Sequence, residues 1–110
     1  MGRFFDLITQ RKTFRQIAPL IRDFSQQCHA DVWDRVRDLI FEMDLTEARG
    51  YVRARAVKVA RRHVDSQLHM HPQFDSQAQL QLKTLVTERV VHLVISDFVA
   101  GGPAARRPAA

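Results

Sequence analysis

Hydrophobic residues recur every three or four positions between residues 46 and 68, which is the period of an α-helix with one buried face. Asp44 with Glu47 three residues later, or Thr46 itself, supplies the side chain that caps such a helix. The pattern therefore predicts a helix over residues 46–68 that packs on a core. Placing successive residues about 100° apart puts one group on its buried arc: Ala48, Val52, Ala56, Val59, Ala60, His63 and Val64.

Two earlier stretches show the same period and predict two further helices. The first begins near Thr13, where Thr13 and Gln16 have the spacing of a capping box. Pro19 inside it predicts a kink or a later start, and residues 3–9 predict a short helical arm before it. The buried face of the first helix is Phe14, Ile17, Ile21, Phe24 and Cys28, and that of the second, over residues 31–43, is Val32, Val36, Leu39, Ile40 and Met43.

A fourth helix is predicted from Asp75 or Ser76 to about Val99. The β-branched run over residues 90–95 leaves a strand as the alternative, but the uninterrupted helix-forming sequence before it favours the helix. Apolar residues lie on two faces of this helix, which therefore needs either a central position or a partner. We expect a homodimer contact through its second face, which comprises Val91, Ile95 and Phe98.

Together these elements predict an all-α fold. It is a compact four-helix bundle over residues 1–100, with a short N-terminal helical arm and a disordered tail at residues 101–110. The second and third helices are joined by only two to three residues, so they must be neighbours, as an antiparallel hairpin or at a steep angle. A chain of 110 residues with 45% apolar side chains suits one domain with its own core. Cys28 is the sole cysteine, so a reducing, cytoplasmic location is expected.

The formal charge of +5 is unevenly distributed, with −1 over residues 1–47 and +6 over residues 48–110. Between Arg49 and Arg62 there are six basic residues and no acidic one. Opposite the buried arc they give a row of candidate polyanion-binding residues, in which a tyrosine would stack on a base while the cations neutralise phosphates. The alternative is a solvated helix face. The row comprises Tyr51, Arg55, Lys58, Arg62 and, further round, Arg61.

Acidic residues recur at steps of three and four on one face of the helix predicted over residues 31–43. They form either a solvated face, helped by the preference for acids near a helix N-terminus, or a surface that docks on the basic row of a neighbouring subunit. These residues are Asp31, Asp34, Asp38 and Glu42.

Several chemistries are disfavoured by what the sequence lacks. His69, His71 and Cys28 do not have the paired spacing of a metal site, so neither a metal nor a cofactor is expected. No nucleophile stands in a catalytic motif, so the chain is not expected to be an enzyme. Charges interrupt the apolar stretch 80–99, so no transmembrane segment is expected, and membrane-surface contact by residues 3–12 is disfavoured against their packing on the bundle.

The sequence thus predicts a non-enzymatic helical interaction or assembly module that is homo-oligomeric. The alternative is a nucleic-acid-binding protein that uses the basic face of the helix over residues 46–68. Self-association and nucleic-acid binding are therefore the two partner classes that a structure has to separate.

Overall fold

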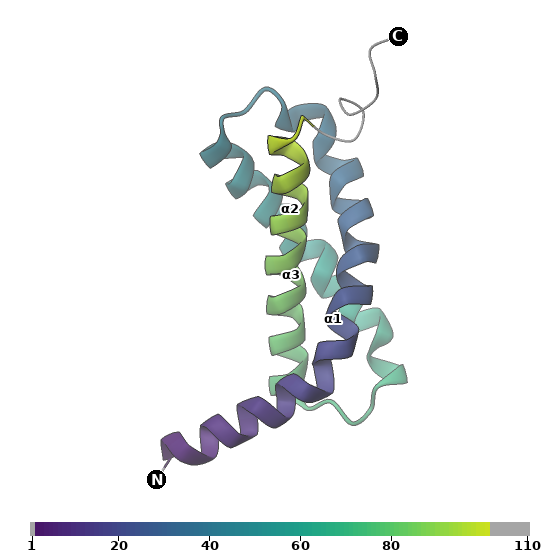
Figure 1. Cartoon of the computed structure of the whole chain (residues 1–110). Coiled ribbons are helices and arrows are strands. Elements are labelled where there is room, and N and C mark those ends of the chain that lie inside the picture. The colour runs from purple at the N-terminus through teal and green to yellow at the C-terminus, as the bar shows by residue number, and fades with distance from the viewer. Residues whose placement is uncertain (1, 102–110) are drawn as a thin grey trace.

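A computed structural model describes the backbone of residues 2–101 and the side chains of residues 14–101. Within that part of the chain there are three α-helices, one short 3₁₀ turn and no strand, which confirms the all-α prediction. Helices α1 and α3 pack together and run in the same direction, and α2 runs the opposite way, crossing behind them in Figure 1. The tail predicted at residues 101–110 lies, beyond Gly101, outside the described residues. The elements are α1 (Gly2–Ile40), α2 (Leu45–Gln67), the 3₁₀ turn (Leu68–Met70) and α3 (Ser76–Val99).

The four-helix prediction is wrong, because the predicted arm and the first two predicted helices are one continuous helix, α1. The expected break at residues 29–31 contains neither glycine nor proline. Asp31, a potential cap for a new helix, instead bonds Arg35 one turn later, with 2.7 Å between Oδ1 and Nε. Such a pair supports a continuous helix. Pro19 lies inside α1, where its missing N–H favours a bend, and Figure 1 shows the N-terminal part of α1 turning away from the bundle.

Aspartate side chains cap the other two helices. Asp44 accepts a hydrogen bond from the backbone N–H of Glu47 at 2.8 Å, and this bond holds the pKa of Asp44 below its usual value. Asp75 accepts a hydrogen bond from the backbone N–H of Ala78, also at 2.8 Å. Asp44 is one of the predicted caps, and Asp75 is one of the two residues at which the fourth helix was predicted to begin. The two aspartates fix where α2 and α3 begin.

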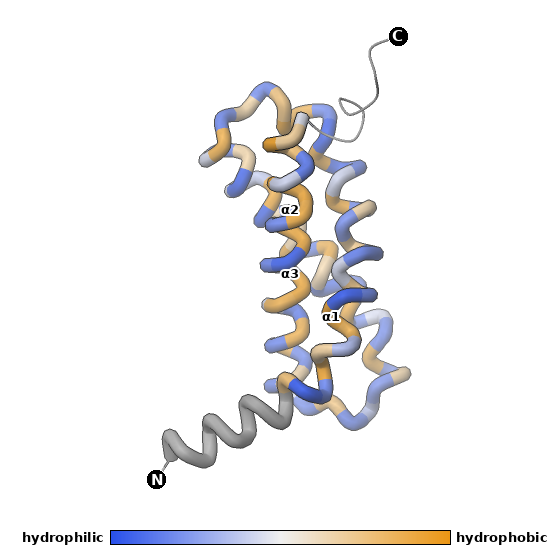
Figure 2. Tube along the Cα trace, viewed as in Figure 1, coloured by the Kyte–Doolittle hydropathy of each residue, from blue (hydrophilic) through white to orange (hydrophobic). Residues whose placement is uncertain are grey.

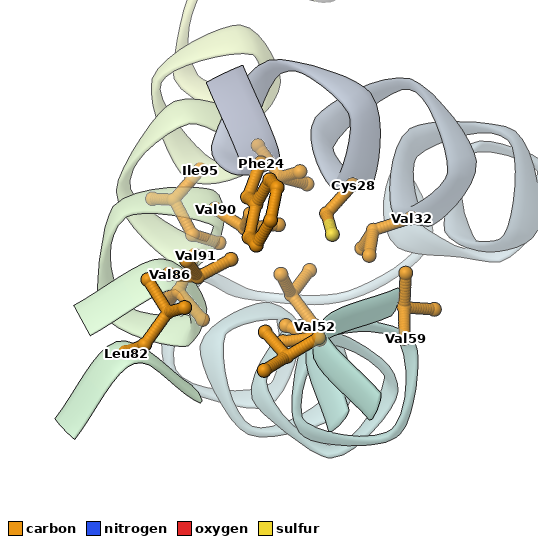
Figure 3. Close-up of a cluster of buried hydrophobic side chains, with 14 of the residues drawn as sticks. Phe24, Cys28, Val32, Val52, Val59, Leu82, Val86, Val90, Val91 and Ile95 are labelled. Atoms are coloured by element: carbon orange, nitrogen blue, oxygen red, sulfur yellow. The ribbon is translucent and has the colours of Figure 1, made fainter. Parts of the chain in front are cut away.

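The core lies where the three helices meet (Figure 3). Six of the seven residues predicted for the buried arc of α2 are buried, which confirms that arc. The seventh, His63, is half-buried with its ring edge-on to Phe24, at 4.8 Å between ring centroids. Helix α1 contributes Ile17, Phe24, Cys28, Val32, Val36 and Ile40 to this core. Phe14 and Leu39, which were also predicted to be buried, are 47% and 48% exposed.

Helix α3 is covered on two faces by its own chain. Figure 2 shows hydrophobic positions along most of α3, and both α1 and α2 pack on it. Val91 and Ile95 are each only 7% exposed and belong to the common core. Phe98 is half-buried against Phe41, with 5.6 Å between ring centroids. The single chain therefore covers Val91 and Ile95 and part of Phe98, which leaves little exposed surface for the homodimer contact expected through these three residues. Residues 90–95 are helical, which excludes the strand.

Gly50 lies near the start of α2 with open space around it. A Cβ atom built at this position meets no atom within 4 Å. Glycine inside a helix costs about 0.5–1 kcal/mol relative to alanine, so Gly50→Ala is expected to raise the free energy of unfolding by about that amount. Urea titration of the two proteins measures the change, and a loss of stability would contradict the open surroundings of this position.

Candidate nucleic-acid interface

The outer side of α2 carries cationic side chains that are all exposed. They lie opposite the buried arc, within a sector of roughly 120°, and extend over about 10.5 Å of the helix axis. None of them forms an ion pair with a carboxylate among residues 14–101. Their charge is therefore available to an external anion. We call this group the basic face of α2: Arg55, Lys58, Arg61 and Arg62.

Two cations on the α2–α3 side of the bundle are instead neutralised within the chain. Arg53 donates to both carboxylate oxygens of Glu88 on α3, with 3.2 Å between Nη2 and Oε2. This pairing raises the pKa of Arg53 and lowers that of Glu88. Lys83 pairs with Asp65, with 2.7 Å between Nζ and Oδ1. Arg61 of the basic face lines the same α2–α3 groove as Glu88, but Glu88 is paired with Arg53. The basic face thus differs from Arg53 and Lys83 in forming no ion pair within residues 14–101.

Tyr51 is engaged within the chain rather than presented for stacking. Its ring is half-buried and packs against the core. The guanidinium carbon of Arg55 lies 5.4 Å from the ring centroid, which is a cation–π contact. The aromatic ring that the sequence offers to a nucleic-acid base therefore supports a cation of the basic face instead.

The acidic residues of α1 lie at one edge of the basic face. Asp31 and Arg62 line the same groove between α1 and α2, which has a volume of about 270 Å³. Among the described residues, no ion pair joins these acids to the basic face. One residue of each row, Asp31 and Arg62, therefore lines this groove, and the two rows are not bonded to each other. The acidic row consists of Asp31, Asp34 and Asp38 on α1 and Glu42 in the turn that follows it, all of them exposed.

The same groove is lined by two side chains with altered pKa values. Burial, with a smaller contribution from the charge of Asp31, raises the pKa of the Cys28 thiol to about 11. Burial also lowers the pKa of His63, whose Nε2 has no hydrogen-bond partner within residues 14–101. At neutral pH both groups are therefore uncharged, and Cys28 is held as the poorly nucleophilic thiol.

The described part of the chain contains neither a cluster of metal-ligating side chains nor a helix that could span a membrane. There, no group of three or more His, Cys, Asp or Glu side chains is arranged to hold a metal ion. His71 instead stacks on Phe74, with 5.3 Å between ring centroids and 11° between the ring planes. Over residues 2–101, none of the helices combines the length and the apolar character that a membrane span requires. Side chains 3–12, considered above for membrane-surface contact, lie outside the described residues.

The sequence pattern did not single out Phe41, which lies just after α1 and is 50% exposed. Its ring packs between Trp33 and Phe98, at centroid distances of 6.1 and 5.6 Å. On the same α1–α3 side, His29 Nε2 and Asp97 Oδ2 are 2.8 Å apart. The sequence does show an aromatic residue in the short connection after α1, which could have marked Phe41 as a packing residue. Its partners, however, can be identified only from the fold.

No family model matches the chain, and no curated protein or solved structure is found to resemble it. Its function is therefore inferred from the sides of the bundle themselves. Internal ion pairs cross the α2–α3 side, and an aromatic cluster and a histidine–aspartate pair cross the α1–α3 side. On the α1–α2 side, Asp31 of the acidic row and Arg62 of the basic face line one groove.

Proposed function

We propose that the protein is a non-enzymatic helical binding module that holds polyanions, and nucleic acid in particular, on the basic face of α2. The observation that carries the proposal is the group of exposed cations on one side of one helix, none paired with a carboxylate within residues 14–101. Arg53 and Lys83 are paired with acids of the same chain, whereas the four cations of the basic face are not.

Phosphate is the anion that suits this face best. Three of its four cations are arginines, whose planar guanidinium groups make paired hydrogen bonds to phosphate oxygens. Duplex DNA presents one charge per roughly 1.7 Å of its axis, so a face about 10.5 Å long meets several phosphates at once. Because the Tyr51 ring is half-buried beneath Arg55, base stacking contributes little. We therefore expect binding that follows phosphate density, stronger for duplex than for single strands, without sequence preference.

Salt dependence is the expected signature of such binding. Four phosphate contacts give a slope of about −3.6 in the logarithm of affinity against the logarithm of salt concentration, because each contact releases about 0.9 counterion from duplex DNA. Affinity is expected in the non-specific range, with dissociation constants of about 10⁻⁴ to 10⁻⁶ M at physiological salt.

The decisive experiment reverses charge on the basic face and, separately, elsewhere. The variant R55E/K58E/R62E is expected to bind a labelled duplex at least roughly tenfold more weakly at low salt, because three contacts become repulsions. Fluorescence anisotropy over a salt series measures the affinity and its slope. Both triple variants have a formal charge of −1 in place of +5, so a difference between them reports position. The matched control reverses exposed cations of α1 and α3: Arg22→Glu, Arg37→Glu and Arg89→Glu.

Two results would contradict the proposal. If the control loses as much affinity as R55E/K58E/R62E, net charge rather than the basic face explains the binding. If the unaltered protein binds neither duplex nor single-stranded DNA or RNA at low salt, polyanion binding is not its function.

A further inference from the structure

We infer that the basic face of α2 also receives the acidic row of α1 from a second copy of this chain, so that self-association and polyanion binding compete for the same cations. The inference deepens the proposed function by naming a protein partner for the same surface and a means of regulating it. Self-association itself is measured on the protein alone, without any polyanion, so the two proposals fail separately.

The two rows of charge begin at one groove and extend in one direction. Asp31 and Arg62 both line that groove. Because α1 and α2 run in opposite directions (Figure 1), both rows extend from it toward the connection between these helices. Asp31 and Asp38 are seven residues apart, and so are Arg55 and Arg62. At about 1.5 Å per residue each interval is about 10.5 Å, so the part of the acidic row from Asp31 to Asp38 matches the basic face in length, and Glu42 lies beyond it.

Two matched rows of opposite charge on one side of a molecule are complementary to a second copy of themselves. A two-fold axis along the groove exchanges the rows and brings the acids of each copy against the cations of the other. The contact is used twice and closes at two copies, so it predicts a dimer and not a filament. The opposed pairs are then Asp31 with the partner's Arg62, Asp34 with the partner's Lys58, and Asp38 with the partner's Arg55.

Most of the charged side chains that this dimer requires form no ion pair within the described part of the single chain. Within residues 14–101, neither Asp34 nor Asp38 forms an ion pair, and the same is true of the basic face. Asp31 bonds Arg35, but both side chains of that pair are about half exposed and can exchange partners. Single exposed ion pairs contribute little and are screened by salt. The dimer therefore depends on several pairs acting together, and we expect it at low salt and not at high salt.

A polyanion that occupies the basic face displaces the acidic row of the second copy. Adding duplex DNA is therefore expected to dissociate the dimer, with one copy of the protein retained on each binding site. Conversely, dimer formation lowers the apparent affinity for DNA as the protein concentration rises, because the two equilibria draw on the same free monomer.

A charge swap between copies tests the inference. One variant reverses the acids (Asp34→Lys, Asp38→Lys) and the other reverses the cations (Arg55→Glu, Lys58→Glu). Each variant alone brings like charges together and is expected to stay at the monomer mass of 12.7 kDa, with a dissociation constant at least roughly tenfold above that of the unaltered protein. Their equimolar mixture restores opposite charge at both copies of the contact and is expected to regain the dimer mass in sedimentation at low salt.

The outcomes are separable. A control with Arg22→Glu and Arg37→Glu, which changes neither row, is expected to associate like the unaltered protein. The inference is overturned if the unaltered protein stays monomeric at low salt, if either swapped variant dimerises alone, or if their mixture does not. The acid-reversed variant keeps the whole basic face, so it is expected to bind duplex DNA at least as tightly as the unaltered protein. A protein that dimerises as described but binds no DNA removes the proposed function and leaves the dimer standing.

Discussion

Ile95→Glu is expected to unfold the single chain rather than to release a folded monomer from a dimer. Ile95 is 7% exposed and lies in the same cluster as Phe24 (Figure 3). An unpaired carboxylate there costs several kcal/mol, on the order of 3–5 kcal/mol, against a total stability of about 5–15 kcal/mol for a domain of this kind. Circular dichroism during urea titration, together with light-scattering mass, measures the outcome.

The control for this substitution is Val99→Glu on the same helix. Val99 is 69% exposed, so the same new charge stays in water and is expected to change stability by about 0.5 kcal/mol or less. A folded, monomeric Ile95→Glu protein with an unchanged unfolding midpoint would show that the face of α3 is not part of the core of the single chain.

Phe24→Ala is expected to lower the free energy of unfolding by about 3–5 kcal/mol, the usual cost of removing a buried aromatic ring. Phe24 is 6% exposed, and its ring meets that of His63 edge-on at 4.8 Å. Phe14→Ala on the same helix is the matched control, because Phe14 is 47% exposed and its loss is expected to cost about 1 kcal/mol or less. Urea titration of the three proteins compares them, and equal losses for the two variants would refute the central position of Phe24.

The loss of Phe24 should also change how stability depends on pH. Burial lowers the pKa of His63 in the folded chain, so the unfolded chain binds a proton more readily. The free energy of unfolding is therefore unaffected by His63 above the ordinary histidine pKa of about 6.5. It decreases as the pH falls below that value toward the lowered pKa of His63 in the folded chain. When the Phe24 ring is removed, water reaches His63. The decrease in the free energy of unfolding between pH 7.5 and pH 5.5, measured by urea titration, is therefore expected to be smaller in Phe24→Ala than in the unaltered protein.

The buried arc of α2 could be predicted because a helix that packs on one side has hydrophobic residues at every third or fourth position of its sequence. The continuity of α1 could not be predicted from the sequence. Asp31 serves equally well as the cap of a new helix or as the first member of a pair with Arg35 one turn later, and local pattern treats the two alike. The coverage of α3 was also hidden, because it depends on where α1 and α2 lie and not on the sequence of α3 itself.

The candidate site was predicted in position but not in detail. Helical geometry alone put Arg55, Lys58 and their neighbours on the solvent side, and they are exposed in the structure. Whether a cation is neutralised depends on residues far away in the chain, as with Arg53 and Glu88, which are 35 positions apart. The support of Arg55 by Tyr51 has the helical spacing of four residues, but that spacing does not say whether the ring faces the cation or an external ligand.

The single thiol of Cys28 gives this fold a built-in reporter of its own opening. The side chain is buried between α1 and α2, and its raised pKa keeps it protonated at neutral pH. An alkylating reagent reacts with the thiolate, so modification requires a local opening that exposes this thiol, which is 2% exposed in the closed fold. The alkylation rate therefore reports how often this opening occurs in the native ensemble. Because Cys28 is the only cysteine in the sequence, the measurement needs no engineered label.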